Sequence, residues 1–335
     1  MPDTGKVDRE FFETQIEPKL GATRDDVALG PKHGVDFGVV TVEDTAVVTA
    51  TDPVSILPQL GFRRAGRFAV RIVLSDVAVS GLPPSHLSIA FTLPPSMTDG
   101  EFAQVWDAVH EECSDLGVSV VTGHTARYEG CSYPWVGGAT AMAVGDPEGI
   151  VRPDGARPGD DLLVTRGPAV EAAGLLSSLF PDEVDVDEST LATVQSGLDD
   201  LDAVRDAATA AAAGRVTAMH DVTEGGLVGA LHEITESGDV RIAFDTDAVP
   251  TQSPVLKTCE ALGMDPWRAT SAGTLLIAVD PEDTDRVVEA LRERDTPVGV
   301  AGRVEAGSGV VIDGEEIPPP DGDASWPVYE RLLEG

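Results

Sequence analysis

Short β-rich runs alternate with segments of helical period along most of the chain, and this alternation is what most constrains its fold. In the first half, residues 37–50 read as two β-rich runs joined by a turn at Glu43-Asp44. Residues 61–80 have their apolar side chains on one helical face, residues 85–93 read as a strand, and a helix is expected from about Asp99 to Gly117. A short buried strand at 118–122 and another at 136–144 complete this half.

The second half has the same alternation after a joint rich in Pro, Gly and Asp at residues 146–161. We place the domain boundary in this joint, which gives domains of residues 1–148 and 149–335. Mixed strands and helices in both halves predict an α+β or α/β fold. The expected elements of the second half are strands at LLVT, TAMHD, RIAFD, GTLLIAV and GVAGRV, and helices near 168–180, 190–213, from Glu224, 254–262 and 282–294.

The charge of the chain limits its partners. Asp and Glu number 58 against 23 Lys and Arg, a net charge of −35. Such a surface repels phosphate backbones, so nucleic acid is not an expected partner. Only four lysines occur and the acid is spread along the whole length, which is typical of a protein from a salt-rich cytosol; an ordinary acidic protein is the alternative.

Several other classes of protein are not expected. No apolar run is long enough to span a membrane, and the first residues lack the pattern of a signal peptide, so we expect a cytoplasmic protein. Cys113, Cys131 and Cys259 form no CxxC pair and are expected to be reduced thiols. The chain also lacks the P-loop and Rossmann glycine motifs.

Three aspartates are candidate ligands of Mg²⁺. Asp36 precedes a predicted strand, Asp52 is placed at the end of the next one, and Asp76 falls on the apolar stripe of the helix at 61–80. A charged Asp on such a stripe is costly unless it is paired or bound to a metal, and carboxylates are ligands that Mg²⁺ prefers. Alternatively, Asp36 and Asp52 are turn or cap residues, and Asp76 pairs with Arg71 or Arg67.

Two glycine-bearing segments are candidate phosphate sites. Gly123, His124 and Thr125 directly follow the predicted strand at 118–122, where the backbone and a hydroxyl could cradle a phosphate. A structural hydrogen-bonding role is the alternative for His124. In the second segment, Asp221 ends a strand, and Gly225 and Gly226 open a helix whose free N–H groups suit an anion. Helix capping alone would explain Asp221 but not the paired glycines.

Taken together, the order of these segments resembles the AIR synthase-like (PurM-type) superfamily. The strings that carry the resemblance are, in order, GVDFGVV, TATDPVS, VLSDVAVSGLPP, VTGHTAR, GARPGDDLLVTRGP, MHDVTEGGL, SAGTLLIAV and GVAGRV. Their spacing is most similar to that of hydrogenase expression/formation protein E and archaeal AIR synthase-related proteins.

The resemblance implies an N-terminal α/β domain that forms a homodimer through its strands, an α+β C-terminal domain, and ATP bound between the two. It implies Asp36, Asp52 and Asp76 as Mg²⁺ ligands, and Gly123, His124, Thr125, Asp221, Gly225 and Gly226 as nucleotide-site residues. His124 and Asp221 are the candidate catalytic residues. The chemistry implied is ATP-dependent phosphorylation of an amide-like or carbonyl oxygen, followed by dehydration or ring closure.

Two positions depart from the pattern of protein E. That protein ends in a Cys that carries the reacting group, whereas no Cys follows Cys259 here, and Ala272 stands where a proton-transferring Glu is expected. The sequence therefore leaves two main hypotheses open: an ATP- and Mg²⁺-dependent enzyme acting on a small molecule, or a non-catalytic nucleotide-binding partner in the maturation of a hydrogenase or another metallocentre. A structural subunit that binds no ATP is a third.

Overall fold

The computed structural model describes residues 5–334, which divide into two compact units. The N-terminal unit comprises residues 25–30 and 36–150. The C-terminal unit comprises residues 151–334, together with the described residues up to Arg24 and residues 31–35. The chain therefore passes from one unit to the other between Ile150 and Val151, inside the Pro/Gly/Asp-rich joint.

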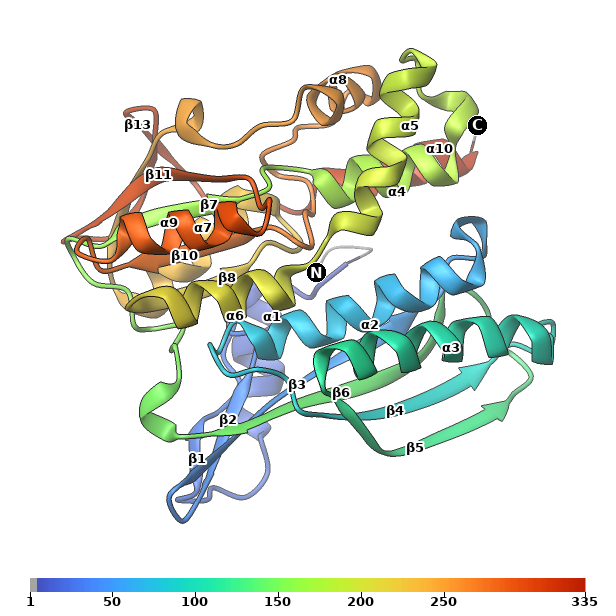
Figure 1. The fold of residues 1–335 in the computed structure, drawn as a ribbon, viewed down its shortest axis with the longest axis horizontal. Helices are drawn as coiled ribbons and strands as arrows, with labels where there is room; N and C mark the ends of the chain where they lie inside the picture. Colours follow the sequence, from blue (N-terminus) through green and yellow to red (C-terminus); the bar gives the residue numbers. More distant parts are fainter. Residues whose placement is uncertain (1–4, 335) are drawn as a thin grey trace. The chain divides into compact units, whose positions relative to one another are not determined.

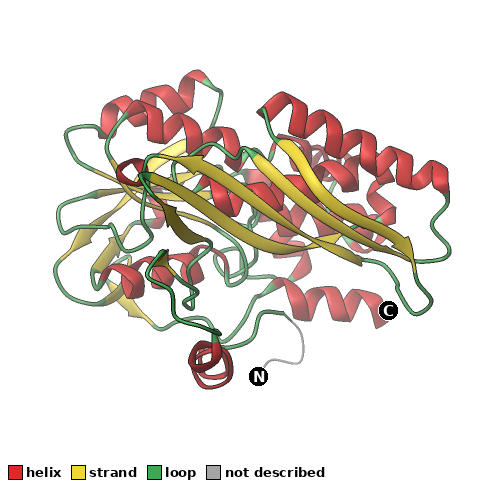
Figure 2. Cartoon of the chain, turned by 90° about the horizontal axis from the view of Figure 1, so that it is seen from below, coloured by secondary structure: helices red, strands yellow, loops and turns green. Residues whose placement is uncertain are grey.

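The N-terminal unit is a six-stranded sheet with two long helices on one face (Figure 1). Its strands follow the spatial order β1-β2-β3-β6-β4-β5, and only the β4–β5 pair is parallel. Figure 2 shows the long strands of this sheet as one twisted layer. The elements are β1 (Val27–Leu29), β2 (Gly38–Val42), β3 (Thr45–Ser55), α2 (Phe62–Ala78), β4 (His86–Leu93), α3 (Asp99–Leu116), β5 (Ser119–Arg127) and β6 (Trp135–Gly145).

Local sequence signals explain most of these elements. The turn between β2 and β3 falls at Glu43-Asp44, as predicted, with Glu43 in the left-handed region (φ 53°). Thr98 and Glu101 form a capping box at the start of α3, and Gly117 ends that helix at φ 73°. The amphipathic α2 buries its apolar stripe against the sheet, as its helical spacing predicted.

Two expectations for the N-terminal unit are wrong. The predicted buried strand at 118–122 is the nine-residue edge strand β5. Almost all of its residues are exposed, because no further strand within residues 5–334 pairs with its outer edge. Asp52 lies inside β3 rather than at a strand end, because the ladder to β6 continues from Asp52, opposite Ala139, to Ser55.

The C-terminal unit is built on a seven-stranded sheet with the order β13-β12-β9-β11-β7-β10-β8. All of its pairs are antiparallel except β12–β9. The apolar β10 is buried along its whole length because it lies between β7 and β8. The strands are β7 (Asp161–Thr165), β8 (Val216–Asp221), β9 (Arg241–Phe244), β10 (Leu275–Val279), β11 (Val298–Glu305), β12 (Gly309–Ile312) and β13 (Glu315–Ile317).

The five helices expected from the sequence are present, one of them broken in two, and α1 and α10 were not predicted. The long helix expected at 190–213 is two helices, because Leu201 is extended and the Asp202 side chain caps a new helix by accepting from the Arg205 N–H. The helices are α1 (Arg9–Phe11), α4 (Val170–Leu179), α5 (Glu188–Gly197), α6 (Ala203–Ala213), α7 (Gly226–Gly238), α8 (Ser253–Leu262), α9 (Thr284–Glu293) and α10 (Ser325–Glu334), with short helical turns at 12–19, 181–183, 198–200 and 246–248.

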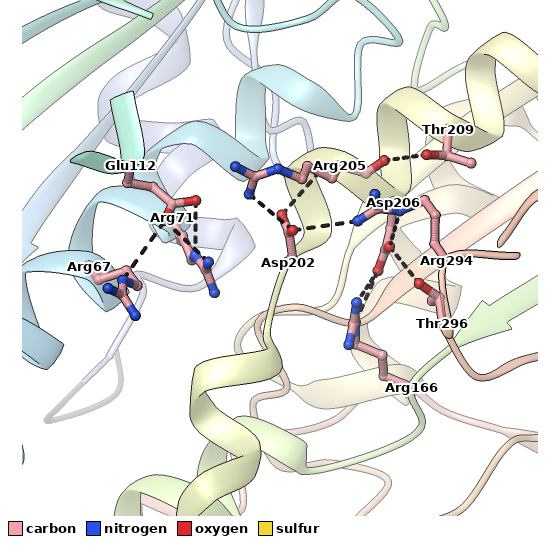
Figure 3. Close-up of polar contacts among 10 residues, drawn as sticks. All are labelled: Arg67, Arg71, Glu112, Arg166, Asp202, Arg205, Asp206, Thr209, Arg294 and Thr296. Carbon is pink, nitrogen blue, oxygen red and sulfur yellow. Dashed lines mark hydrogen bonds and ion pairs between the residues drawn. The ribbon is translucent and has the colours of Figure 1, made fainter. Parts of the chain in front are cut away.

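A buried ion-pair network ties α6 to β7 and to the end of α9. Asp206 is fully buried and accepts two hydrogen bonds from Arg166, at 3.0 and 2.6 Å, and one from the Thr296 hydroxyl at 2.7 Å (Figure 3). Arg294 lies 3.5 Å from both Asp206 and Asp202. Because each buried charge has an opposite partner, the cost of desolvating them is offset.

The N-terminal unit has a smaller network of the same kind. Glu112 of α3 is buried and pairs with Arg71 of α2 at 3.1 Å, with Arg67 at 4.0 Å (Figure 3). Arg67 and Arg71, the two residues considered from the sequence as partners of Asp76, thus each form an ion pair that joins α2 to α3.

The first described residues pack on the C-terminal unit. The Lys6 backbone N–H donates to the Glu224 carboxylate at 2.7 Å, and Arg9 pairs with Glu236 of α7. These contacts join positions more than 200 residues apart, which no local sequence signal predicts. Within residues 5–334, none of the helices is long and apolar enough to cross a membrane.

Candidate functional site

The strongest candidate site lies in the C-terminal unit, in the turn between β8 and α7. Asp221, the last residue of β8, is 1% exposed, and Val222 then donates to the Thr274 carbonyl. Gly225 and Gly226 follow in the left-handed region, at φ 87° and 61°. A Cβ on Gly226 would lie 2.7 Å from the Trp267 carbonyl oxygen. Backbone conformation and close packing therefore account for the glycine pair without a ligand.

The first N–H groups of α7 already have partners within the unit. The Gly225 N–H donates to Asp323 Oδ2 at 2.8 Å, and the Gly226 N–H donates to the Thr223 carbonyl at 3.0 Å. The Val228 N–H donates to the Trp267 carbonyl at 3.0 Å. From the sequence we expected an anion at this end of the helix. At Gly225, the negative group present in the structure is the carboxylate of Asp323.

A His–Glu pair lies beside Asp221. His220 Nδ1 is 2.6 Å from the Asp221 carbonyl oxygen, and His220 Nε2 is 3.2 Å from Glu233 Oε2 of α7. Burial acts to raise the pKa of Glu233, but the hydrogen bond and charge of His220, helped by Lys6 and His33, outweigh it and lower the pKa to about 2. Glu233 is therefore a carboxylate at neutral pH, and it orients the His220 ring.

Glu171, which was not selected from the sequence, is a buried carboxyl of this unit with a strongly raised pKa. It stands in the first turn of α4 and is 7% exposed. Its Oε2 accepts from the Thr270 hydroxyl and from the Ala272 N–H, both at 2.7 Å. Burial raises its pKa to about 7, against the lowering effect of these two hydrogen bonds. Glu171 is the only charged residue between Arg166 and Asp182, a signal the sequence did contain.

Asp323, also not selected from the sequence, is a second buried carboxyl in this region. Burial raises its pKa, while hydrogen bonds from Ser325 and from the Gly225 N–H act to lower it. It connects the start of α10 to the turn that precedes α7. The region around Asp221 therefore contains two carboxyl groups, Glu171 and Asp323, whose proton affinity is raised.

In the N-terminal unit, Gly123, His124 and Thr125 do not form a loop after a strand. All three lie inside the parallel edge strand β5, opposite Ile89, Ala90 and Phe91 of β4. A Cβ on Gly123 would lie 2.3 Å from the Ile89 carbonyl oxygen, so the close approach of β4 requires glycine here. His124 stacks on Tyr128, with Nε2 3.0 Å from its hydroxyl oxygen, and the side chains of His124 and Thr125 are exposed.

The three candidate metal ligands come from three adjacent elements of the N-terminal unit. Asp36 lies two residues before β2, Asp52 is in β3, which pairs with β2, and Asp76 is on α2, which packs against the sheet. All three are partly buried. Among the described residues, their oxygens do not all come within 4.8 Å of one another. They therefore do not form a closed cage of three carboxylates around one ion.

Comparison with known proteins gives matches over both units. Residues 34–145 match the N-terminal domain of AIR synthase related proteins, and residues 157–315 match the C-terminal domain. The chain is 28% identical over 263 residues to carbamoyl dehydratase HypE of Rhizobium leguminosarum bv. viciae, covering 78% of this chain and 73% of that protein.

Solved structures have the same fold. Escherichia coli HypE superposes with a TM-score of 0.73 at 24% identity, covering 95% of this chain and 97% of that one. A hydrogenase maturation protein HypE in complex with ATP has a TM-score of 0.65 at 22% identity, covering 91% and 88%. The order of the two matched domains along residues 34–315 is the order of the sequence motifs. The chain belongs to the family of AIR synthase related proteins.

Proposed function

We propose that this protein is an ATP- and Mg²⁺-dependent enzyme that phosphorylates the oxygen of a carbamoyl or similar amide group and then eliminates phosphate. The observation that carries the proposal is the match of both AIR synthase related domains, combined with the relatives' names: a carbamoyl dehydratase, and a HypE structure with ATP. In this reaction the amide oxygen attacks the γ-phosphorus and ADP leaves. The nitrogen then loses its protons as the C–O bond breaks, which gives a nitrile and phosphate.

Each unit supplies residues with a separate role. In the N-terminal unit, Asp36, Asp52 and Asp76 would hold Mg²⁺ together with phosphate oxygens and water, because Mg²⁺ commonly takes only one or two carboxylates in phosphate sites. The bound ion would offset the charge of the transferring phosphoryl group. The exposed side chains of His124 and Thr125, beside Gly123 on β5, are available to the nucleotide.

In the C-terminal unit, we assign Asp221 to the contact with nucleotide or substrate, and Gly225 and Gly226 to the shape of the turn that follows it. The N–H groups of these glycines are engaged within the unit, so they would serve the site through this turn rather than by donating to phosphate. Asp221, fixed at the end of β8, would then orient the phosphates or their metal-bound water.

The carbamoyl group is expected to arrive on another molecule. Cys113 and Cys259 are buried, and burial raises the pKa of their thiols to about 11 and about 12. Neither thiol is therefore suited to carry a reacting group. Cys131 is the partly exposed thiol, in the segment between β5 and β6. We assign the carbamoyl group to a small molecule or to a segment of a maturation-partner protein, and an unchanged rate in Cys131→Ala would support this assignment.

The test measures ADP and nitrile formation from ATP, Mg²⁺ and N-acetyl-S-carbamoylcysteine in concentrated KCl. We expect nitrile formation that depends on both ATP and Mg²⁺. Asp76→Asn should raise the Mg²⁺ concentration needed for half-maximal rate, whereas Asp107→Asn, at an exposed position of α3, should not. ATP hydrolysis without nitrile, or equal Mg²⁺ dependence of both variants, would contradict the assignment.

We also propose a homodimer formed through the edge strand β5. Val120 and Val121 of this strand are 40% and 51% exposed, and an uncovered strand edge is a site for pairing with another chain. Val121→Lys should yield monomers in analytical ultracentrifugation. Val42→Lys, at another exposed valine of the same sheet, should leave the dimer intact.

The alternative function is a non-catalytic nucleotide-binding partner in hydrogenase or metallocentre maturation. The naming of relatives as hydrogenase maturation proteins favours a role in such a pathway. Tight ATP binding in calorimetry, without release of ADP in the presence of the carbamoylated probe, would support this alternative over the enzyme.

A further inference from the structure

We propose that Glu171 is the catalytic base that takes a proton from the nitrogen of the phosphorylated carbamoyl group. This inference rests on the proposed function and names the proton acceptor that the elimination requires. It is argued from residues of the C-terminal unit alone.

The first argument is the way the Glu171 carboxyl is held. Thr270 and Ala272 both donate to the same oxygen, Oε2. The segment that contains them is fixed in turn, because Ser271 Oγ accepts from the Val170 N–H and the Thr274 hydroxyl donates to the Gly167 carbonyl. These contacts give the carboxyl one defined orientation at the start of α4. Both hydrogen bonds are to Oε2, so a bond to Oε1 is not needed to hold the group. Such fixed placement is what a proton acceptor needs.

The second argument is the charge around the group. Asp323 and Asp221 lie close enough for their negative charges to raise the pKa of Glu171 further. The elements that pack on α4 do not add a buried charge, since their charged residues are all exposed. These residues are Asp182, Glu183, Glu188, Asp199, Asp200, Lys257 and Glu260.

The third argument is the match between proton affinity and task. A general base works best when its pKa lies near the working pH, and burial brings the pKa of Glu171 to about 7. Glu233, by contrast, is held as a weakly basic carboxylate by His220. Glu171, rather than Glu233, is therefore the carboxyl group suited to accept a proton.

After transfer of the phosphoryl group to oxygen, the nitrogen releases its first proton to water, and the neutral intermediate has a C=N–H group and a C–O–phosphate bond. Glu171 takes the remaining proton from nitrogen, the N–H electron pair forms the third C–N bond, and the C–O bond breaks with its electrons on phosphate. Glu171 then returns the proton to solvent.

A purely structural role for Glu171, as a tie between α4 and the 270–272 segment, makes different predictions. Glu171→Gln keeps an oxygen that can accept from Thr270 and Ala272, so the tie survives, but the amide cannot take up a proton. Thr270→Val removes one hydrogen bond that lowers the pKa of Glu171, so it should raise that pKa while leaving the base in place.

The experiment measures nitrile formation from ATP and N-acetyl-S-carbamoylcysteine against pH, for the wild type and three variants. We expect the wild-type rate to rise with pH around 7. Glu171→Gln should lower the rate about 100-fold or more, with unchanged ATP affinity, and the rise of the rate with pH should disappear. Thr270→Val should keep most of the rate, but the rise of the rate with pH should occur at a higher pH than in the wild type. Glu188→Gln, the same change in the first turn of α5, should match the wild type.

The outcomes separate the two proposals. An active Glu171→Gln variant with the wild-type pH profile overturns the role of Glu171 and leaves the proposed function standing. A wild type that forms no nitrile overturns the proposed function, and this inference with it. As an independent readout, NMR of 13C-labelled glutamate carboxyls should show one signal that titrates near pH 7 and is missing in Glu171→Gln. Its absence from the wild type overturns the inference whatever the activity.

Discussion

Asp323 Oδ2 accepts a hydrogen bond of 2.8 Å from the Gly225 N–H, so a residue just before the last helix caps the entry to α7. The other oxygen of the same carboxylate accepts from the Ser325 N–H at 2.8 Å. One buried side chain therefore fixes two helix starts that are almost 100 residues apart in sequence.

Removing this side chain should destabilise the C-terminal unit. We expect Asp323→Ala to lower the free energy of unfolding by about 1–2 kcal/mol, the usual cost of a lost cap. Urea unfolding in concentrated KCl measures the change. Asp321→Ala, at an exposed neighbouring position, serves as the control, and an equal loss in both variants would show that Asp323 has no special role.

The buried carboxyl of Glu171 should make stability depend on pH. Its pKa is about 7 in the folded protein and near 4.5 when exposed, so the folded state binds the proton more tightly. Below pH 4.5 the group is neutral in both states, and its contribution is fully present. As the pH rises towards 7, the unfolded state ionises first and the folded state loses stability.

This effect is isolated by comparing the wild type with Glu171→Gln. The wild type should lose Tm relative to the variant as the pH is raised from about 4.5 to about 7, in thermal unfolding followed by circular dichroism. A difference in Tm that is constant over this range would mean that the pKa of Glu171 is not raised.

Breaking the Asp206 network should be more damaging than losing a cap. Asp206→Ala leaves Arg166, which is largely buried, without its partner. We expect a loss of about 3–5 kcal/mol in the free energy of unfolding, because an uncompensated buried charge remains. Asp185→Ala, at an exposed aspartate of the same unit, should change it by less than about 0.5 kcal/mol. A small loss for Asp206→Ala would mean that Arg166 finds water or another partner.

The net charge of −35 predicts a strong dependence of stability on salt. Raising KCl from about 0.1 M to about 1 M shortens the screening length from ~10 Å to ~3 Å, which weakens the repulsion among surface carboxylates. We expect Tm to rise steeply over this range in differential scanning calorimetry. A Tm that does not change with KCl would argue against adaptation to a salt-rich cytosol.

Periodicity and turn residues predicted two units of mixed strands and helices but left α+β and α/β open, and the resemblance to a family was what implied the α+β fold. Local sequence signals indicate the hairpin at Glu43, the capped helix that ends at Gly117 and the buried strand β10. Sequence alone could not show that β5 is an edge strand, because an apolar run such as VSVVT looks the same at the edge and in the centre of a sheet. Nor could it show the break at Leu201, because apolar residues at helical spacing, Val194, Leu198, Leu201 and Val204, continue across it.

The candidate site was predicted only in outline. The turn at Asp221, Gly225 and Gly226 was found from its residues, but its N–H partners were not, since Asp323 and Thr223 reach them through the folded chain. Glu171 is the lone charge in an apolar helix, but its two hydrogen-bond donors, Thr270 and Ala272, lie about 100 residues away, so local sequence could not show how it is held. The roles of Asp36, Asp52 and Asp76 stay predictions.

The contacts of the first residues have a practical consequence for dissecting this protein. Glu224 and Glu236 receive Lys6 and Arg9, and Gly34 packs against Glu233, so residues from the beginning of the chain complete the C-terminal unit. A fragment that starts at Val151 would expose acidic side chains that are now neutralised or covered. A polypeptide of residues 151–335 should therefore reach the stability of this unit only when the leading segment is supplied, as a tethered or separately added peptide.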